Sequence, residues 1–277
     1  MSQADGGPER PVGEAAALDR YSAGVLSHER PTELKRLQAL ERMSDGWTRQ
    51  VLADRGLRGD WRCLELGAGA GGIARWLAGQ CPDGRVVALD VDTRFLDAGR
   101  LGNLDIVQGD LREAEFPPGS FDLVHARALM MHLPDPERMI ARAARWLAPG
   151  GRLVLEDPVN FTTDSSPYPA WRRAMRALEE ILAAQGGDLT WARRRQTAAL
   201  AEAGLTELGL AVHPLIVGDG GAVDAFMRLF FEQIGPELIA QNRLTEAQLA
   251  EGLAMLDDPG FLDVTHCLYT GWGCRPA

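Results

Sequence analysis

The sequence is poor in positive charge and has no long apolar run. Its 277 residues include 29 Lys and Arg against 39 Asp and Glu, which gives a formal net charge of −10. Such a balance argues against nucleic acid as a partner, because binding requires cations that displace counterions from phosphates. No apolar segment reaches the length of a membrane span, so we expect no membrane partner. A small-molecule ligand fits this composition better.

Cysteine is also scarce. The four cysteines are Cys63, Cys81, Cys267 and Cys274. They form no CxxC pair and lie beside no histidine cluster, so we expect no metal site. Two of them fall in predicted buried strands, which favours reduced thiols in a cytoplasmic protein. The N-terminus carries no apolar core of signal-peptide length, and its richness in Gly, Pro and charge predicts a disordered tail over 1–19.

Strand and helix patterns alternate through the first part of the chain. The predicted strands up to Asp157 are 62–66, 85–90, 104–110, 121–128 and 152–157. Helical spacing of apolar residues covers 31–57 and 72–79, and a helix over 135–147 is capped by Asp135. Such alternation implies right-handed crossovers and a parallel sheet with helices on both faces.

The alternation of single strands and helices ends after Asp157. An amphipathic helix around Trp171 to Leu182 is followed by a strand at 208–217. Two more helices are predicted at 222–241 and 245–257, and the final segment alternates like a strand. Two late strands are therefore joined by a long helical insertion.

A glycine-rich turn follows the first predicted strand. Gly67, Gly69 and Gly72 satisfy GxGxxG, and Asp90 lies 18 residues after Gly72, which suits a dinucleotide site. Glu65, two residues before the first glycine, would repel a pyrophosphate and would suit a ligand that carries an ammonium group. A further acid, Asp110, follows the third strand, where it could accept a hydrogen bond from an adenine amino group.

Five segments together resemble the class I S-adenosylmethionine-dependent methyltransferases. They are "LELGAGAG", "ALDVD", "GD", "FDLVHARALMMHLPDP" and "LAPGGRLVLED". The resemblance covers about residues 20–277, and "YSAG", "HLPDP" and "YTGWGCRP" look most like the small-molecule methyltransferases of bacterial secondary metabolism. It implies an α/β fold: a Rossmann-like seven-stranded, mostly parallel sheet with an antiparallel last strand and helices on both faces.

The resemblance also implies a division of the chain. An N-terminal helical lid is expected over 20–58. The methyltransferase domain is expected over 59–277, with segments that roof the substrate at about 158–195 and 222–257. The helical insertion lies after the fifth strand.

S-adenosylmethionine is the cofactor that the resemblance implies, with S-adenosylhomocysteine as product. Asp90 would bind both ribose hydroxyls, Val91 and Leu111 would sandwich the adenine, and Asp110 would reach its amino group. The alternative for Asp90 and Asp110 is an ordinary strand-end cap. The cofactor-binding residues expected are Tyr21, Glu65, Gly67, Ala68, Gly69, Asp90, Val91, Asp110, Leu111, Ala126 and Arg127. Arg127 would lie near the methionine portion, or it would pair with a surface acid.

Methyl transfer requires a positioned acceptor, exclusion of water and sometimes removal of a proton. His132, after the fourth strand, is the predicted general base; the alternative is that it anchors the "HLPDP" turn. An apolar substrate pocket is expected, with plain helix core as the alternative for part of its wall. The wall residues expected are Met130, Met131, Trp171, Phe226 and Phe230.

The sequence thus predicts methyl transfer to an O, N or C atom of a small, largely apolar molecule, such as an antibiotic or other natural-product intermediate. A homodimer is common among similar proteins. One alternative is an S-adenosylmethionine-binding enzyme that catalyses a cyclisation or another non-methylating step. An NAD-dependent oxidoreductase fits the glycine spacing, but Lys35 is the sole lysine and no hydride-transfer Tyr-Lys site is evident. A non-catalytic ligand-binding module is the fourth alternative.

Overall fold

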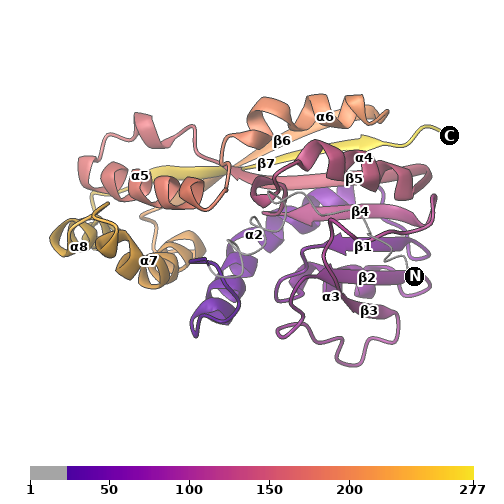
Figure 1. Cartoon of the computed structure of the whole chain (residues 1–277), viewed down its shortest axis with the longest axis horizontal. Helices are drawn as coiled ribbons and strands as arrows, with labels where there is room; N and C mark the ends of the chain where they lie inside the picture. Colours follow the sequence, from indigo (N-terminus) through magenta and orange to yellow (C-terminus); the bar gives the residue numbers. More distant parts are fainter. Residues whose placement is uncertain (1–23) are drawn as a thin grey trace, which may run out of the picture.

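The computed structural model describes residues 24–277, so the predicted tail and Tyr21 lie outside the described residues (Figure 1). A seven-stranded sheet has the order β3-β2-β1-β4-β5-β7-β6. Its strands are β1 (Arg62–Leu66), β2 (Arg85–Asp90), β3 (Leu104–Gln108), β4 (Phe121–Arg127), β5 (Leu147–Val159), β6 (Thr206–Val217) and β7 (Asp263–Cys274). Neighbours from β3 to β5 pair in parallel, whereas β7 runs antiparallel to β5 and β6. The predicted sheet with its antiparallel last strand is confirmed.

The helices follow the predicted order, except that α6 was not predicted. They are α2 (Glu33–Asp54), α3 (Gly72–Gln80), α4 (Pro136–Trp146), α5 (Pro169–Ala184), α6 (Thr197–Glu202), α7 (Ala222–Ala240) and α8 (Glu246–Ala254). Asp135 caps α4 by accepting a hydrogen bond from Arg138 N–H at 3.0 Å, and Thr245 and Gln248 form the expected capping box of α8. A π-helical turn at Ala192–Gln196 was not expected.

The fifth strand begins earlier than the predicted 152–157. Leu147 already pairs with Phe121, and the register then shifts so that Leu123 pairs with Arg152. The "APGG" segment therefore lies inside β5 as an irregularity and does not separate it from α4. The pattern of the sequence indicated a turn here because Pro and Gly are typical of turns.

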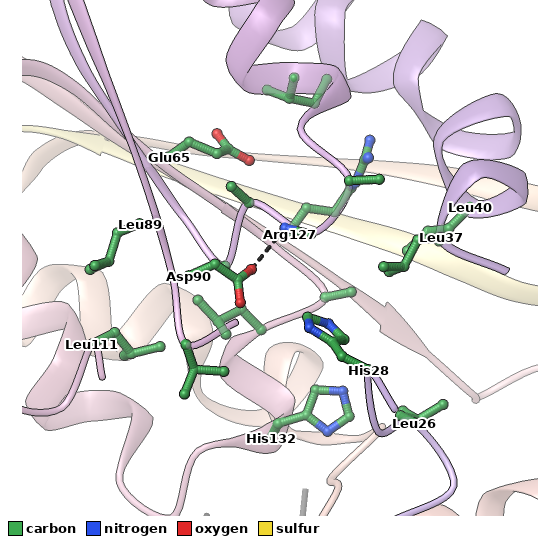
Figure 2. A pocket seen from close by; sticks show the side chains of 18 of the residues that line it. Leu26, His28, Leu37, Leu40, Glu65, Leu89, Asp90, Leu111, Arg127 and His132 are labelled. Atoms are coloured by element: carbon green, nitrogen blue, oxygen red, sulfur yellow. Dashed lines mark hydrogen bonds between the residues drawn. The ribbon is translucent and has the colours of Figure 1, made fainter. Parts of the chain in front are cut away.

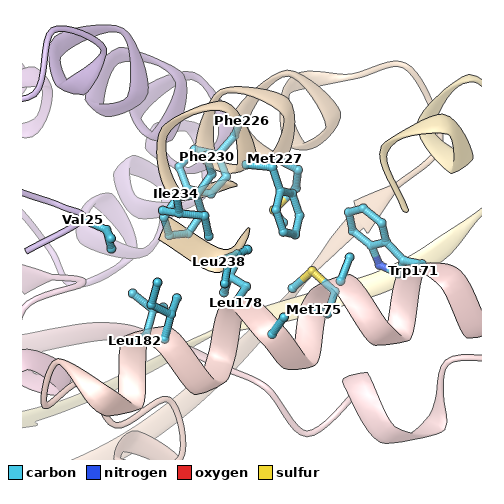
Figure 3. Close-up of a cluster of buried hydrophobic side chains, with 14 of the residues drawn as sticks. Val25, Trp171, Met175, Leu178, Leu182, Phe226, Met227, Phe230, Ile234 and Leu238 are labelled. Carbon is cyan, nitrogen blue, oxygen red and sulfur yellow. The ribbon is translucent and has the colours of Figure 1, made fainter. Parts of the chain in front are cut away.

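The late helices build a hydrophobic core of their own. Figure 1 places α5, α7 and α8 beyond the carboxyl ends of the parallel strands. Side chains from α5 and α7 face one another there, including Met175, Leu178 and Ile234, as Figure 3 shows. The helix α2 packs against α7, and α5 packs against α8. The insertion therefore extends the molecule past the sheet edge where ligands bind in such folds.

Buried polar contacts fasten α2 to the sheet. Thr48 Oγ1 donates to Glu156 Oε1 at 2.6 Å, and Thr270 Oγ1 donates to Glu156 Oε2 at 2.7 Å. Trp47 Nε1 donates to Thr270 Oγ1 at 3.1 Å. Because Glu156 is 1% exposed, these donors satisfy a carboxylate that water does not reach. Helix α2 therefore has a defined position against β5 and β7.

Three observations bear on the expectations drawn from composition. All four cysteines are buried and free. Within residues 24–277, no three His, Cys, Asp or Glu side chains gather as metal ligands. None of the helices in this range is both long and apolar enough to cross a membrane.

Candidate active site

Two adjoining cavities lie at the carboxyl edge of the sheet. The large cavity has a volume of about 180 Å³ and the small cavity about 80 Å³. The large cavity is walled by the loops after β1, β2, β3 and β4, and the small one by α5, α7 and β7. Six residues line both cavities: Leu26, Arg36, Leu40, Arg127, Ala128 and His132.

The glycine turn forms one wall of the large cavity. Gly67, Gly69 and Gly71 adopt φ values of 65°, 56° and 85°, a region that glycine enters without steric cost. Asp90 faces this turn: its Oδ2 accepts from Gly69 N–H at 2.8 Å and its Oδ1 from Asp92 N–H at 3.1 Å (Figure 2). Burial raises the pKa of Asp90, and the two backbone donors oppose that rise. The turn and the end of β2 thus hold each other in place.

Glu65 contributes a buried carboxylate to the same cavity. It is 4% exposed, and its Oε2 lies 2.7 Å from Nδ1 of His125, its direct partner across β1 and β4. Among the described residues, Nε2 of His125 has no hydrogen-bond partner. A proton on Nδ1, donated to Oε2 of Glu65, satisfies this geometry. The sequence analysis did not identify His125. Once β1 and β4 are known to be neighbours, however, their pairing places His125 beside Glu65.

The helix α2 and the segment before it close the large cavity. Leu37 and Leu40 lie across it from Leu89 and Leu111 (Figure 2). Glu41 Oε1 accepts a hydrogen bond at 2.6 Å from the N–H of Gly72, the first residue of α3. An acidic side chain at a helix N-terminus is favourable. This contact joins α2 directly to the glycine-rich segment, and it was not predicted from the sequence.

Comparison with known proteins decides which family this architecture represents. Residues 64–155 match a methyltransferase domain family. Methyltransferase str3 of Strobilurus tenacellus is 41% identical over 98 residues, 35% of either chain. The trans-aconitate 2-methyltransferase of Azoarcus sp. is 30% identical over 176 residues, 60% of this chain and 66% of that one. Residues 64–155 therefore form a methyltransferase domain of the class I S-adenosylmethionine-dependent type.

The solved structures agree at the level of fold. A putative methyltransferase from Bacillus halodurans superposes with a TM-score of 0.56 at 20% identity, covering 83% of this chain and 98% of that one. Such a low identity establishes the fold alone. The chain spans between about a third and two thirds of the length of the curated relatives that it matches.

Most of the residues expected to bind the cofactor meet at one place. Those that line the large cavity are Glu65, Gly67, Ala68, Gly69, Asp90, Val91, Asp110, Leu111 and Arg127. Ala126 is 1% exposed within β4 and does not line the cavity. Asp110 pairs with Arg112 at 2.7 Å. Arg127 is engaged by Asp45 of α2 at 2.8 Å, so the expected pairing with an acid exists, but the pair is buried and not at the surface.

The expected substrate wall is only partly assembled. Met131, Phe226 and Phe230 line the small cavity. Met130 and Trp171 do not: each is 1% exposed and belongs to a hydrophobic core, Met130 beside α4 and Trp171 between Phe231 and Phe261. The two successive methionines point to different cores, and only Met131 reaches the cavity. Apolar side chains at these positions could not be divided by periodicity alone.

His132 lies where the two cavities meet. The positive φ of Ala128, 50°, turns the chain after β4, and the 3-10 helix Met130–His132 then carries the imidazole to the junction (Figure 2). Burial, assisted by the Arg36 guanidinium, lowers the pKa of His132 to about 4. The ring is therefore neutral near pH 7 and can accept a proton.

Proposed function

We propose that this chain transfers the methyl group of S-adenosylmethionine to an O, N or C atom of a small, largely apolar molecule. The observation that carries the proposal is the position of His132, which lines both the large cavity and the apolar small cavity. A cofactor in the first cavity and an acceptor in the second would meet beside a neutral imidazole. The methyltransferase domain at 64–155 supports the choice of reaction.

The side chains of the large cavity suit the parts of S-adenosylmethionine. Glu65 offers a carboxylate to the ammonium of the amino-acid head, and the glycine turn allows close approach of the backbone. Asp90 would bind the ribose, since each oxygen that accepts a backbone N–H retains a second lone pair. Val91 and Leu111 would sandwich the adenine, with Asp110 at its amino group. Arg127 would lie near the methionine portion.

The bound cofactor supplies an activated methyl group for in-line displacement. The protein orients the acceptor, and the lid residues Leu37 and Leu40 exclude water. A pKa of about 4 makes His132 a weak base, but a hydroxyl or amine that attacks a methyl becomes strongly acidic in the transition state. Neutral His132 can therefore accept that proton as the new bond forms.

The acceptor is proposed to be a natural-product intermediate of secondary metabolism, and the chain to act as a homodimer. The apolar lining of the small cavity supports the first point, together with the resemblance of "HLPDP" and "YTGWGCRP" to small-molecule methyltransferases. Gel filtration with light scattering tests the second.

Calorimetric titration with S-adenosylmethionine, S-adenosylhomocysteine and NAD in parallel tests the cofactor. We expect micromolar binding of the first two and none of NAD. A screen of apolar alcohols, phenols and amines, read by the formation of S-adenosylhomocysteine, then tests the reaction. Binding of NAD alone would overturn the proposal.

A further inference from the structure

The small cavity has a polar corner on β7 that the large cavity does not share. Its polar lining residues Arg36, Arg127 and His132 are shared with the large cavity, whereas Thr265 and His266 on β7 line the small cavity only. Most of the other residues that line the small cavity are apolar. They include Leu178, Leu182, Leu215, Phe226, Met227 and Phe230. A molecule that filled this cavity would therefore contact a mostly apolar wall, the polar residues shared with the large cavity, and the polar residues of β7.

A carboxylate fixes the orientation of His266. Nε2 of His266 lies 3.4 Å from Oε1 of Glu179 on α5. The same carboxylate accepts from Thr163 Oγ1 and, at 3.0 Å, from Asn160 Nδ2. Three donors converge on Glu179, so the Nε2 that faces it carries a proton.

In a neutral imidazole whose proton is on Nε2, the other ring nitrogen is a hydrogen-bond acceptor. Within residues 24–277, Nδ1 of His266 makes no hydrogen bond, and it is not among the wholly buried unpartnered atoms. The neighbouring Thr265 hydroxyl is already directed to Met175 Sδ at 3.4 Å. Nδ1 of His266 is therefore the acceptor that this corner of the cavity offers to a ligand.

We propose that His266 recognises a hydroxyl or N–H group at the end of the substrate remote from the methyl-accepting atom. The proposal rests on the proposed function and narrows its substrate class to apolar molecules that carry a distal hydrogen-bond donor. His266 is a specificity-determining residue and not the base, because it lines only the cavity that the cofactor does not enter. Glu179 acts through His266 as a positioning residue.

Matched probes test this recognition without knowledge of the natural substrate. The protein is saturated with S-adenosylhomocysteine and titrated with three pairs that differ by one hydroxyl: 2-naphthol and naphthalene, 4-phenylphenol and biphenyl, 1-octanol and octane. For each pair the ratio of dissociation constants is compared with the ratio of octanol–water partition coefficients. Titration with S-adenosylhomocysteine alone reports separately on the proposed function.

Three variants accompany the wild type. His266→Phe keeps a ring and removes Nδ1, and His266→Asn retains an acceptor close to the Nδ1 position. His213→Phe is the matched control, because His213 stacks on Trp47 from the neighbouring β6 and lines neither cavity. Folding of each variant is checked by its affinity for S-adenosylhomocysteine.

We expect the wild type to prefer the hydroxyl member of at least one pair by about 10-fold beyond the partition ratio. His266→Phe should lose that preference while it keeps its affinity for the apolar member, and His266→Asn and His213→Phe should retain it. In wild-type protein labelled with ¹⁵N-histidine, 2-naphthol should shift the Nδ1 resonance of His266 and naphthalene should not.

A wild type that discriminates in no pair, or a His266→Phe variant that still discriminates, overturns the proposal. Normal S-adenosylhomocysteine binding in that case would leave the proposed function standing.

Discussion

Arg127 on β4 and Asp45 on helix α2 form an ion pair with 2.8 Å between Nη2 and Oδ1. The other oxygen of the same carboxylate pairs with Arg49, also at 2.8 Å. The two guanidinium groups differ in their surroundings: the side chain of Arg127 is 9% exposed and that of Arg49 is 43% exposed. Asp45 thus pairs with Arg49 at the surface and with Arg127 at the junction of the two cavities.

The first prediction concerns this shared carboxylate. Arg127→Met should lower the free energy of unfolding by about 2–3 kcal/mol, because it removes hydrogen bonds from buried Asp45 and Thr48. Arg49→Met should cost about 1 kcal/mol or less, since water screens that pair. Urea unfolding measures both, and amide hydrogen exchange over 33–54 should accelerate in Arg127→Met. Equal costs would show that α2 is not held through Arg127.

The second prediction concerns Asp90. Asp90→Ala should weaken binding of S-adenosylhomocysteine by about 100-fold or more, because hydrogen bonds to a charged group contribute about 1.5–3 kcal/mol each. It also removes the acceptor of Gly69 N–H, so the glycine turn loses support. Asp83→Ala, at an exposed position, is the control. Calorimetry that finds unchanged affinity in Asp90→Ala would remove this residue from the cofactor site.

The third prediction concerns His132. With an acceptor from the screen, His132→Ala should lower kcat by about 10²–10⁴-fold and leave the affinity for S-adenosylhomocysteine within a few-fold. Because the pKa of His132 lies near 4, the residue stays neutral between pH 8 and pH 5, and its ionisation should not alter wild-type kcat in that range. As the pH approaches 4, His132 becomes protonated and kcat should fall. A variant with undiminished kcat would indicate that His132 only supports the turn after β4.

The fourth prediction concerns Asp157, a fully buried carboxyl at the end of β5 with one oxygen that has no hydrogen-bond partner among the described residues. Burial raises its pKa to about 8, from an ordinary value near 4. The folded state therefore retains a proton that the unfolded chain releases. The stabilisation is complete below pH 4, declines as the pH rises, and is lost above about pH 8.

Asp157→Asn, which stays neutral at every pH, should remove this decline. Urea unfolding of wild type and variant at pH 5 and pH 8.5 provides the comparison. On going from pH 5 to pH 8.5, the free energy of unfolding of the wild type should fall by several kcal/mol relative to that of the variant. Each unit of pKa shift corresponds to about 1.4 kcal/mol. Parallel pH dependences would show that Asp157 ionises normally in the fold.

Much of the fold could be predicted because it depends on local patterns. The alternation of short apolar segments with amphipathic ones determined the strands and helices, and side-chain caps such as Asp135 and Thr245 determined where helices begin. The large cavity could be predicted for a related reason. Parallel strands bring their carboxyl ends to one edge, so the glycine turn, Asp90 and Asp110 had to meet once the strand ends were known.

The remaining features were decided by tertiary packing. The contacts of Glu65 with His125, and of Glu41 with Gly72, join segments that are distant in the sequence and carry no shared motif. An apolar residue at helical spacing can face a core or a cavity equally well. Which of Met130 and Met131 reached the small cavity therefore depended on where α5 and α7 packed. The same packing made His266 of a late strand line the cavity that His132 also lines. The burial of a side chain depends on all the elements that pack around it, so the sequence of its own element does not determine it.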